Sequence, residues 1–274
     1  MRSCLHSVSL PELPILEVLR EAKRHGYRAV ELNAETLPWA PPHVTPKTTV
    51  AERKAIVESA NALDLTLPAL GAHIPMVDAD PASRTAAIAF VSGCIDLAGD
   101  LGAPIVHILS GPLPQGVSRD EAWRWFAEAA AETTARAEKA GVVLGVEAIA
   151  GHLFHGVDDY HRLRKDLRGA PWRVNFDPSH LIVQGENPMR VVEELADEVV
   201  HMHLKDGAGR FPEFTFPPLG SGDIDFKALT DRLRAIGYNG AMSIEYEAQV
   251  YGFKLSDEEI LRSGRAFLSS LDVA

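Results

Sequence analysis

Two short stretches of the chain carry the residue types that bind divalent metal ions. They are Asp177–His180, which reads DPSH, and His201–Asp206, which reads HMHLKD. The first follows the apolar run Val174–Phe176 and the second begins just after Val199 and Val200, and glycine or proline follows each of them. Carboxylate and imidazole groups at the ends of two neighbouring strands favour one shared divalent-ion site. We expect that site at the mouth of a parallel barrel.

Side-chain alternation along a strand predicts which of these groups point inward. Val200, Met202 and Leu204 share one face and should meet the surrounding helices. His201, His203 and Lys205 therefore share the face that points to the barrel axis. The same reasoning turns one ionisable group inward from each of four successive strands, namely Glu147, Asp177, His203 and Glu245.

Three carboxylates that converge without a cation would repel one another, and at least one of them would be protonated. One divalent ion removes that repulsion. Three oxygen donors and one imidazole suit Mn²⁺, which we expect in the first place, with Mg²⁺, Co²⁺ or Zn²⁺ as alternatives. The alternative without a metal is that these residues are separate polar groups at strand ends, each solvated or paired with a neighbouring charge.

The elements that must position these groups recur in eight rounds of apolar strand, loop and amphipathic helix. Helical periodicity is clear in Leu13–His25, Val50–Asp64 and Ala122–Lys139. The expected strands are Ser3–Val8, Ala29–Asn33, Thr66–His73, Pro104–Ser110, Val142–Ile149, Arg173–Asp177, Val199–Lys205 and Gly240–Tyr246. This pattern predicts an α/β fold, a single (β/α)8 barrel (a TIM barrel) over residues 1–274, close to the roughly 250 residues typical of that fold.

Local signals predict where the helices begin and end. Thr49, Ser118 and Ser256 each precede a glutamate by three residues, which is the pattern of a capping box. Asp80 and Asn187, each followed by proline, are expected N-caps, and Asp223 is expected to cap the helix after the Gly-Ser-Gly turn. Gly26, Gly102, Gly141 and Gly237 are expected to end helices in the left-handed conformation.

Loop lengths indicate which end of the barrel carries the site. Turns from helix to strand are short, whereas the strand-to-helix loops Ala34–Lys47, Gly111–Val117 and Asp206–Gly222 are long. This asymmetry places the active site at the C-terminal face of the strands. A doubly wound open sheet is the alternative, but its phosphate-binding glycines are missing after the first strand, which continues as His6-Ser-Val-Ser-Leu-Pro11.

Composition restricts the class of protein and its partners. The 274 residues include 46% apolar ones, but no run reaches the roughly 18 that a membrane helix needs. The N-terminal residues lack the pattern of a signal peptide, and two cysteines, Cys4 and Cys94, fit a reducing compartment, so we expect a cytoplasmic protein without membrane contact. A net charge of −11 argues against nucleic acid as a partner. The oligomeric state stays open, with a homo-oligomer as one alternative.

Further histidines end other strands or follow them, and the loop before Gly222 adds an arginine. We expect the following residues to contact a substrate: His6, His73, His107, His152, His180, Lys205 and Arg210. For His107, inside the apolar run 105–109, a hydrogen-bonded core role is the stronger alternative. Phe211, Phe214 and Phe216 form either the wall of a lid or a patch packed on the barrel rim. Trp123 and Trp125 are two residues apart on a helix and are expected to pack against neighbouring helices.

The chain resembles the xylose-isomerase-like barrel superfamily of sugar isomerases and epimerases. The resemblance depends on these motifs: Gly26–Leu32, Val146-Glu147, Phe176–Leu181, His201–Asp206, Leu219–Phe226 and Ser243–Glu245. In the ketose 3-epimerase and inosose branches, the matching positions imply Glu147, Asp177, His203 and Glu245 as metal ligands and His180 and Arg210 as substrate contacts. Endonuclease IV shares this fold, and His73 and His107 resemble two of its zinc ligands. Its Asp-x-His pair is replaced here by Phe216 and Pro218.

The leading hypothesis is a metal-dependent isomerase or epimerase of a keto sugar or keto cyclitol. Glu147 and Glu245 would act as base and acid in a proton transfer beside a carbonyl, through an enediolate. A metal-dependent dehydratase of an inosose or a dehydroshikimate-like acid would use the same first step. A non-catalytic sugar-binding subunit and an endonuclease IV-like DNA-repair enzyme are further alternatives.

Overall fold

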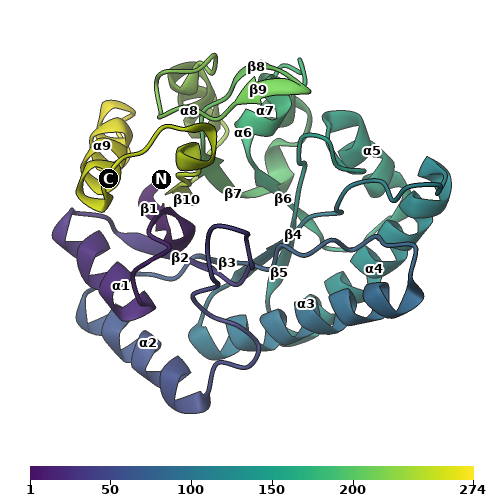
Figure 1. The fold of residues 1–274 in the computed structure, drawn as a ribbon, viewed down its shortest axis with the longest axis horizontal. Helices are drawn as coiled ribbons and strands as arrows, with labels where there is room; N and C mark the ends of the chain where they lie inside the picture. Colours follow the sequence, from purple (N-terminus) through teal and green to yellow (C-terminus); the bar gives the residue numbers. More distant parts are fainter.

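Eight parallel strands close into a barrel in the computed structural model, which describes residues 1–274. The strands follow one another around the barrel in the order β1, β10, β7, β6, β5, β4, β3, β2, so that β1 pairs with both β2 and β10. The barrel strands are β1 (Arg2–His6), β2 (Ala29–Asn33), β3 (Ala69–Gly71), β4 (Ile105–Ile108), β5 (Val143–Glu147), β6 (Arg173–Phe176), β7 (Val199–Leu204) and β10 (Ala241–Ile244). The expected (β/α)8 barrel is therefore confirmed (Figure 1).

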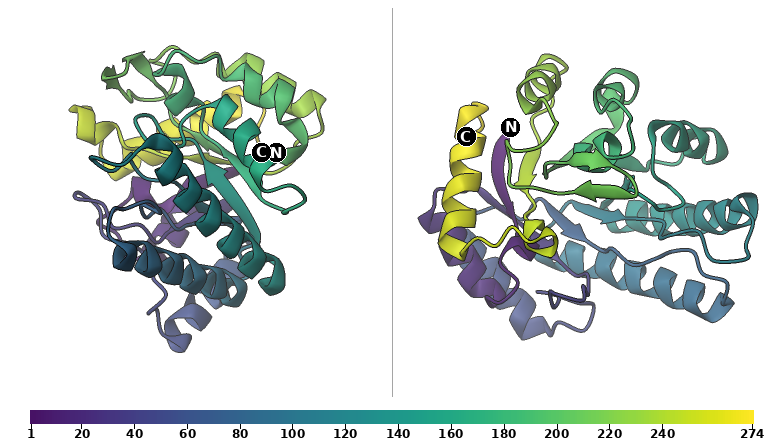
Figure 2. Two further views of the ribbon diagram at one scale, coloured as in Figure 1. Left: turned by 90° about the vertical axis from the view of Figure 1, so that its right-hand side faces the viewer. Right: turned by 45° about the horizontal axis from the view of Figure 1, so that its top comes forward.

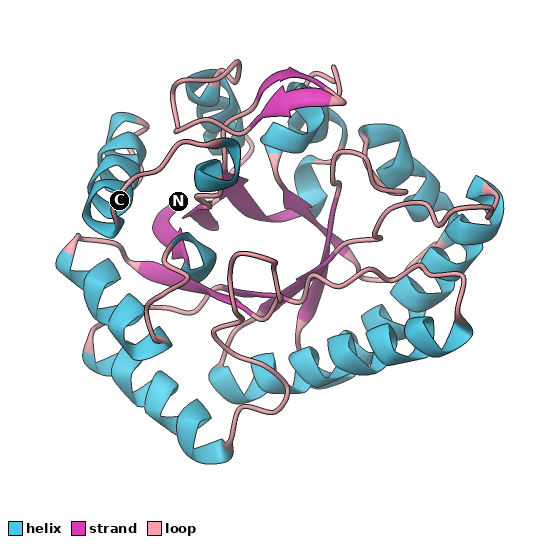
Figure 3. Cartoon of the chain, in the orientation of Figure 1, coloured by secondary structure: helices cyan, strands magenta, loops and turns pink.

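Helices surround the strand ring on its outside (Figure 3). They are α1 (Ile15–Arg24), α2 (Val50–Ala62), α3 (Pro81–Leu101), α4 (Arg119–Ala140), α5 (Val157–Asp166), α6 (Pro178–Ile182), α7 (Met189–Glu194), α8 (Phe226–Ala235) and α9 (Asp257–Ser270). Three short 3-10 turns, η1 (Ser7–Ser9), η2 (Ala196–Glu198) and η3 (Ala248–Tyr251), complete the connections. No helix combines the length and the apolar character needed to cross a bilayer. Two views show the N- and C-termini side by side, and the Ser3 amide donates to the Ala274 carbonyl (2.6 Å) (Figure 2).

One continuous apolar core lies between the strands and the helices. On β7, Met202 and Leu204 belong to this core and are 0% exposed, as the alternation of side chains predicts. His201 and His203 on the opposite face meet Glu31 of β2 across the barrel. The strand pattern therefore delivers the polar groups to the barrel axis, because burying Met202 and Leu204 against the helices leaves the axis as the only position for their neighbours.

Helix caps agree with the sequence at most positions. Thr49 and Ser256 form complete capping boxes, and Asp80 caps α3. At Ser118 only the serine half of the box is present.

Two expected N-caps were wrong. Asp225, not Asp223, caps α8 by accepting from the Ala228 amide (2.9 Å), since the amide of Asp223 donates to the Gly207 carbonyl and the residue still belongs to the loop. Pro188 occupies the N-cap position of α7, although Asn187 accepts from the Met189 amide (3.0 Å).

The loop after β7 contains an antiparallel hairpin that the sequence analysis did not predict. Its strands are β8 (Ala208–Arg210) and β9 (Glu213–Thr215), and the hairpin lies at the edge of the barrel mouth (Figure 1). The strands are three residues long, which is too short for a recognisable alternation. At its tip, Phe211 packs over Gly151 in the loop after β5, where an added Cβ would lie 2.8 Å from the ring.

Candidate metal centre and active site

Four side chains from four adjacent strands converge at the C-terminal mouth of the barrel. Glu147 ends β5, Asp177 follows β6, His203 lies in β7 and Glu245 follows β10. One potential ligand atom from each lies within 4.8 Å of those of the others. All four residues are at most 7% exposed. The four side chains that the sequence predicts to converge do converge. Their role as metal ligands stays a prediction.

The donor set fits a divalent ion because two of its atoms are buried without hydrogen-bond partners. The Nδ1 atom of His203 lies 3.5 Å from Glu147 Oε1 and 3.3 Å from Glu245 Oε2, but makes no hydrogen bond. Asp177 uses Oδ1 to accept from the Ser179 amide at the start of α6, and its Oδ2 makes no hydrogen bond but lies 3.1 Å from the Lys205 ammonium, with which it forms an ion pair. Lone pairs that face one another in a buried site require a cation or a proton between them.

Glu31 of β2 determines which nitrogen of His203 faces this site. The carboxylate of Glu31 is 0% exposed, and its Oε1 accepts from Nε2 of His203 (3.0 Å). An ionised carboxylate can only accept, so the proton of a neutral His203 stays on Nε2 and Nδ1 presents its lone pair to the mouth. An outer partner of this kind orients a histidine ligand and raises its basicity.

Three further histidines surround Glu31 below the mouth. Nε2 of His107 and of His201 donate to Glu31 (2.5 and 2.8 Å), and Nε2 of His6 lies 3.4 Å from the same carboxylate. His107 is 0% exposed, and its Nδ1 lies 2.6 Å from Nε2 of His73. Both ring nitrogens of His107 are thus engaged inside the protein, which favours its core role over the expected substrate contact.

The Lys205 ammonium joins the carboxylates on one side of the site. Its Nζ lies 2.7 Å from Glu245 Oε2, 3.0 Å from Glu247 Oε2 and 3.1 Å from Asp177 Oδ2. On the other side, the Asn175 amide donates to Glu147 Oε2 (2.7 Å). Glu147 and Glu245, the two candidates for proton transfer, are therefore each fixed by a hydrogen bond to one carboxylate oxygen, from Asn175 and Lys205 respectively.

The other expected substrate contacts lie at different depths. Nε2 of His73 is 3.1 Å from Glu147, and Nε2 of His180 is 3.6 Å from Asp177. His152 is half-buried in the loop after β5, and its Nδ1 has no hydrogen-bond partner. Arg210 is exposed on β8 with its guanidinium against Gly185, and it makes no ion pair with the carboxylates of the site. Arg210 is thus not brought to the cluster in this arrangement.

An aromatic wall borders the mouth, formed by Phe214, Phe216 and Tyr251. The ring of Phe216 lies 5.3 Å from that of Tyr251 and 5.1 Å from that of His180, between centroids. The Lys205 ammonium is 4.9 Å from the Phe216 ring centre. Of the three phenylalanines expected in a lid or a rim patch, Phe216 therefore borders the site, and Phe214 packs behind it against Phe216 and Tyr251 of η3 (5.2 and 6.0 Å between ring centroids).

Burial and charge shift the pKa values of the cluster in opposite directions. Burial raises the pKa of Asp177 to about 6, against the pull of Lys205 and with the added repulsion of Glu147 and Glu245. Burial alone would lower the pKa of His203, but Glu245, Glu31 and Glu147 raise it well above its ordinary value. Without an ion the site therefore holds a proton on His203 at neutral pH.

Three residues of the site were missed by the sequence analysis as functional groups: Glu31, Asn175 and Glu247. Glu31 could have been found, because Ala29, Glu31 and Asn33 share the inward face of β2. Glu247 follows the last strand, where alternation no longer predicts a direction. Asn175 is two residues before Asp177, and only the register of β5 with β6 places it beside Glu147.

An eight-stranded parallel barrel with converging acidic and histidine side chains at its C-terminal face defines a class of barrel enzyme folds. The family model of the xylose isomerase-like TIM barrel matches residues 19–271, and the chain belongs to this family.

Comparison with individual proteins agrees with that assignment. The chain is 26% identical over 263 residues to a putative hydroxypyruvate isomerase of Streptomyces coelicolor, covering 88% of each chain. It is 26% identical over 255 residues to a putative L-ribulose-5-phosphate 3-epimerase of Escherichia coli, covering 87% of this chain and 84% of the relative. The crystal structure of an IOLI protein with a bound zinc atom superposes with a TM-score of 0.82 at 18% identity, covering 99% and 98% of the two chains.

We predict that binding of a divalent ion releases protons. At pH 7 the ion must displace the proton of His203, whose pKa is raised, so about one proton should leave per ion. Below pH 6 protonated Asp177 releases a second proton. The affinity for the ion should therefore fall about tenfold for each unit by which the pH is lowered toward 6, and by up to about a hundredfold for each unit below pH 6. Calorimetric titration of Mn²⁺ in buffers of different ionisation enthalpy measures this number. A value near zero at pH 7 would contradict the prediction.

Replacement of Glu31 should weaken metal binding although Glu31 lies outside the ligand group. In Glu31→Gln the neutral amide no longer holds the Nε2 proton of His203 with a charged acceptor, so the affinity for Mn²⁺ should fall about 10- to 100-fold. Glu193→Gln is the matched control, since Glu193 is exposed on α7 and contacts neither Glu31 nor a ligand. Equal affinities of the two variants, measured by calorimetry on folded protein, would refute the role given to Glu31.

Proposed function

We propose that the protein is a divalent-metal-dependent isomerase or epimerase of a keto sugar or keto cyclitol. The observation that carries this proposal is the convergence of Glu147, Asp177 and Glu245 on the unpartnered Nδ1 of His203. The names of the two relatives above support the reaction class, since one is a putative isomerase and the other a putative epimerase.

Glu147 and Glu245 would carry the proton. They come from β5 and β10, which are separated by β6 and β7 in the barrel, so they face one another across the mouth. Burial alone would raise the pKa of each, but His203 and His73 beside Glu147, and Lys205 and His203 beside Glu245, hold both pKa values well below their usual range. Both are therefore carboxylates able to accept a proton. One would remove the proton next to the carbonyl and the other would return one from the opposite side.

The neighbours of these two residues would position the substrate. The bound ion would supply a Lewis acid for the carbonyl and an adjacent hydroxyl. Lys205 keeps its charge, because Asp177, Glu245 and Glu247 outweigh the effect of burial and raise its pKa. Its ammonium and the neutral ring of His180 can hydrogen-bond to substrate oxygens. Phe216 offers an apolar surface to the C–H face of a sugar ring.

The charge of the mouth favours a neutral substrate. Six carboxylates lie in or around the site, namely Glu31, Glu35, Glu147, Asp177, Glu245 and Glu247. They are opposed by the two charges of an ion, by Lys205 and by His73, whose pKa is raised to about 10 because Glu147 and Glu35 outweigh burial. Burial raises the pKa of Glu247 to about 7, so this carboxylate adds only part of a charge at neutral pH. Two like charges 8 Å apart repel by about 2 kcal/mol at an effective dielectric constant of 20. A phosphate ester would meet this excess of negative charge.

We expect a competent substrate to take up deuterium at one carbon in D₂O, observed by proton NMR with Mn²⁺ present. Glu147→Gln and Glu245→Gln should each lower the exchange rate by at least about a thousandfold, because the amide cannot accept the proton. Glu193→Gln, an exposed site on α7, is the matched control and should exchange like the parent protein.

This experiment needs one control and has two outcomes that would change the proposal. Bound Mn²⁺ must be measured in each variant, so that loss of the ion is separated from loss of the base. Turnover without any solvent label would refute proton transfer. An enone signal in the same spectra would indicate dehydration in place of isomerisation.

Selectivity for uncharged substrates should be visible in a paired comparison. A ketose should have a kcat/KM at least about tenfold higher than its terminal phosphate monoester, because the excess carboxylates repel the ester. Glu35→Gln, which removes one rim charge, should narrow this ratio. A preference for the phosphate ester in both proteins would contradict the charge argument without affecting the proton-transfer proposal.

A further inference from the structure

A buried hydroxyl holds the backbone on both sides of Glu147, one of the two glutamates assigned to proton transfer. The Tyr160 hydroxyl of α5 accepts from the Ala148 amide (3.1 Å) and donates to the Val146 carbonyl (3.0 Å). It also lies 3.3 Å from the carbonyl of Asn175, whose side chain holds Glu147. Tyr160 is 1% exposed, and burial raises the pKa of its hydroxyl well above the usual value, so the hydroxyl keeps the proton that it donates.

A second hydroxyl holds Glu245 in the same way. The Ser9 hydroxyl of η1 accepts from the Tyr246 amide (2.9 Å) and donates to the Ile244 carbonyl (3.1 Å). Ser9 is also 1% exposed. The two hydroxyls come from unrelated elements, a helix after β5 and a 3-10 turn after β1. Each of these hydroxyl bridges nevertheless joins the carbonyl before a glutamate to the amide after it.

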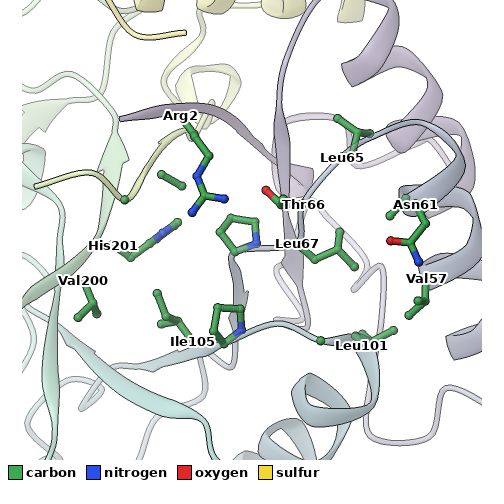
Figure 4. A pocket seen from close by; sticks show the side chains of 16 residues that line it. Arg2, Val57, Asn61, Leu65, Thr66, Leu67, Leu101, Ile105, Val200 and His201 are labelled. Carbon is green, nitrogen blue, oxygen red and sulfur yellow. The ribbon is translucent and has the colours of Figure 1, made fainter.

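An ordinary parallel pair shows what the hydroxyl bridges replace. Thr66, at a cavity of about 450 Å³ in the opposite end of the barrel (Figure 4), pairs with Ala29 of β2. The Thr66 amide donates to the Arg28 carbonyl (3.1 Å), and the Val30 amide donates to the Thr66 carbonyl (3.0 Å). One residue of a parallel strand thus uses its N–H and its C=O to span one residue of its neighbour. A hydroxyl both donates and accepts, so a single oxygen atom can take over both roles.

This replacement lets a neighbouring chain turn away while the peptide groups around the glutamate stay paired. β1 pairs with β10 as far as Leu5 and Ile244, and the chain then enters η1. From there the Ser9 hydroxyl returns to the strand end that carries Glu245. On the other edge the amide of Glu245 donates to the Leu204 carbonyl of β7 (3.1 Å). Because buried peptide groups need partners, these bonds fix the direction in which the Glu245 side chain leaves the strand.

We propose that Tyr160 and Ser9 are positioning residues for the proton transfer, a role that rests on the proposed function. Each fixes the peptide groups around one glutamate and so sets the direction of its carboxylate across the mouth. Asn175 and Lys205 hold the carboxylates, whereas the hydroxyl bridges hold the strand ends that carry them. Both hydroxyls are buried and bonded to backbone, so their loss acts on the reaction only through the two glutamates.

Tyr160→Phe and Ser9→Ala test this role, because each removes one oxygen atom. Tyr27→Phe is the matched control for the first, since it removes a hydroxyl of a 0% exposed tyrosine that donates to a backbone carbonyl of α9 (3.0 Å). Ser3→Ala is the matched control for the second, since the buried Ser3 hydroxyl has no hydrogen-bond partner. The two hydroxyl bridges are independent, so if one variant does not fold the other decides.

The affinity for Mn²⁺ alone, measured by calorimetry on folded protein stripped of metal, is the first readout. Tyr160→Phe and Ser9→Ala should each bind the ion about tenfold more weakly than the parent, because each shifts one expected ligand. Both controls should bind as the parent does. Amide hydrogen exchange should become faster at Ala148 in the first variant and at Tyr246 in the second. Unchanged exchange, or one affinity for variants and controls, would overturn the positioning role.

A second readout separates the two glutamates. With Mn²⁺ in D₂O and D-fructose, or another ketohexose that the parent labels, deuterium enters the recovered substrate through the glutamate that removes the proton. It enters the product through the glutamate that returns one. The two variants should therefore shift the ratio of label in substrate to label in product in opposite directions, by about threefold or more. A purely structural defect would lower total exchange and leave this ratio unchanged.

Failure of the positioning role and failure of the proposed function give different results. If the parent binds Mn²⁺ and labels a ketohexose, but variants and controls share one affinity and one ratio, the positioning role is wrong and the proposed function stands. If the parent neither binds Mn²⁺ nor labels a ketohexose, the proposed function is wrong, and the role that rests on it is refuted as well.

Discussion

The meeting of many negative charges on the barrel axis is the constraint on which the rest of the structure depends. Glu147, Asp177 and Glu245 approach one another in a buried space, and Glu31 lies below them. Such an arrangement is stable only when positive charge or protons are distributed among them. Lys205 on one side, and His203 and His73 with their raised pKa values on the other, provide that compensation in the protein itself. A divalent ion would replace the proton of His203 in this balance.

The same compensation prepares the site for chemistry. Lys205 holds one oxygen of Glu245, and Asn175 holds one oxygen of Glu147, so both carboxylates are fixed in direction across the mouth. His203 links the two halves of the network, because its Nε2 is bound to Glu31 and its Nδ1 faces the carboxylates. A change near Glu31 therefore reaches the mouth through the ring of His203, and it also reaches Glu147 through His107 and His73.

Much of this arrangement could be predicted from the sequence. Alternation of apolar and polar residues in 199–205 predicted which face of β7 points inward, and loop lengths predicted which end of the barrel carries the site. The predictions failed where the signal is short. The three-residue strands β8 and β9 have no readable period, and the cap of α8 was placed two residues early, at Asp223 instead of Asp225. Both errors fall in the loop after β7, where loop geometry decides the hydrogen bonds.

The sequence by itself determined the number of strand–helix rounds, the inward faces of the strands and the four ionisable groups at the C-terminal ends. Local periodicity is sufficient for these, because the burial of one face requires it. Only the tertiary structure decided which atoms meet. Glu31 reaches His201 and His203, about 170 residues away in sequence, because barrel closure leaves only β1 and β10 between β2 and β7. The β8–β9 hairpin holds the Arg210 guanidinium against Gly185 and away from the site, a side-chain direction that no local pattern encodes.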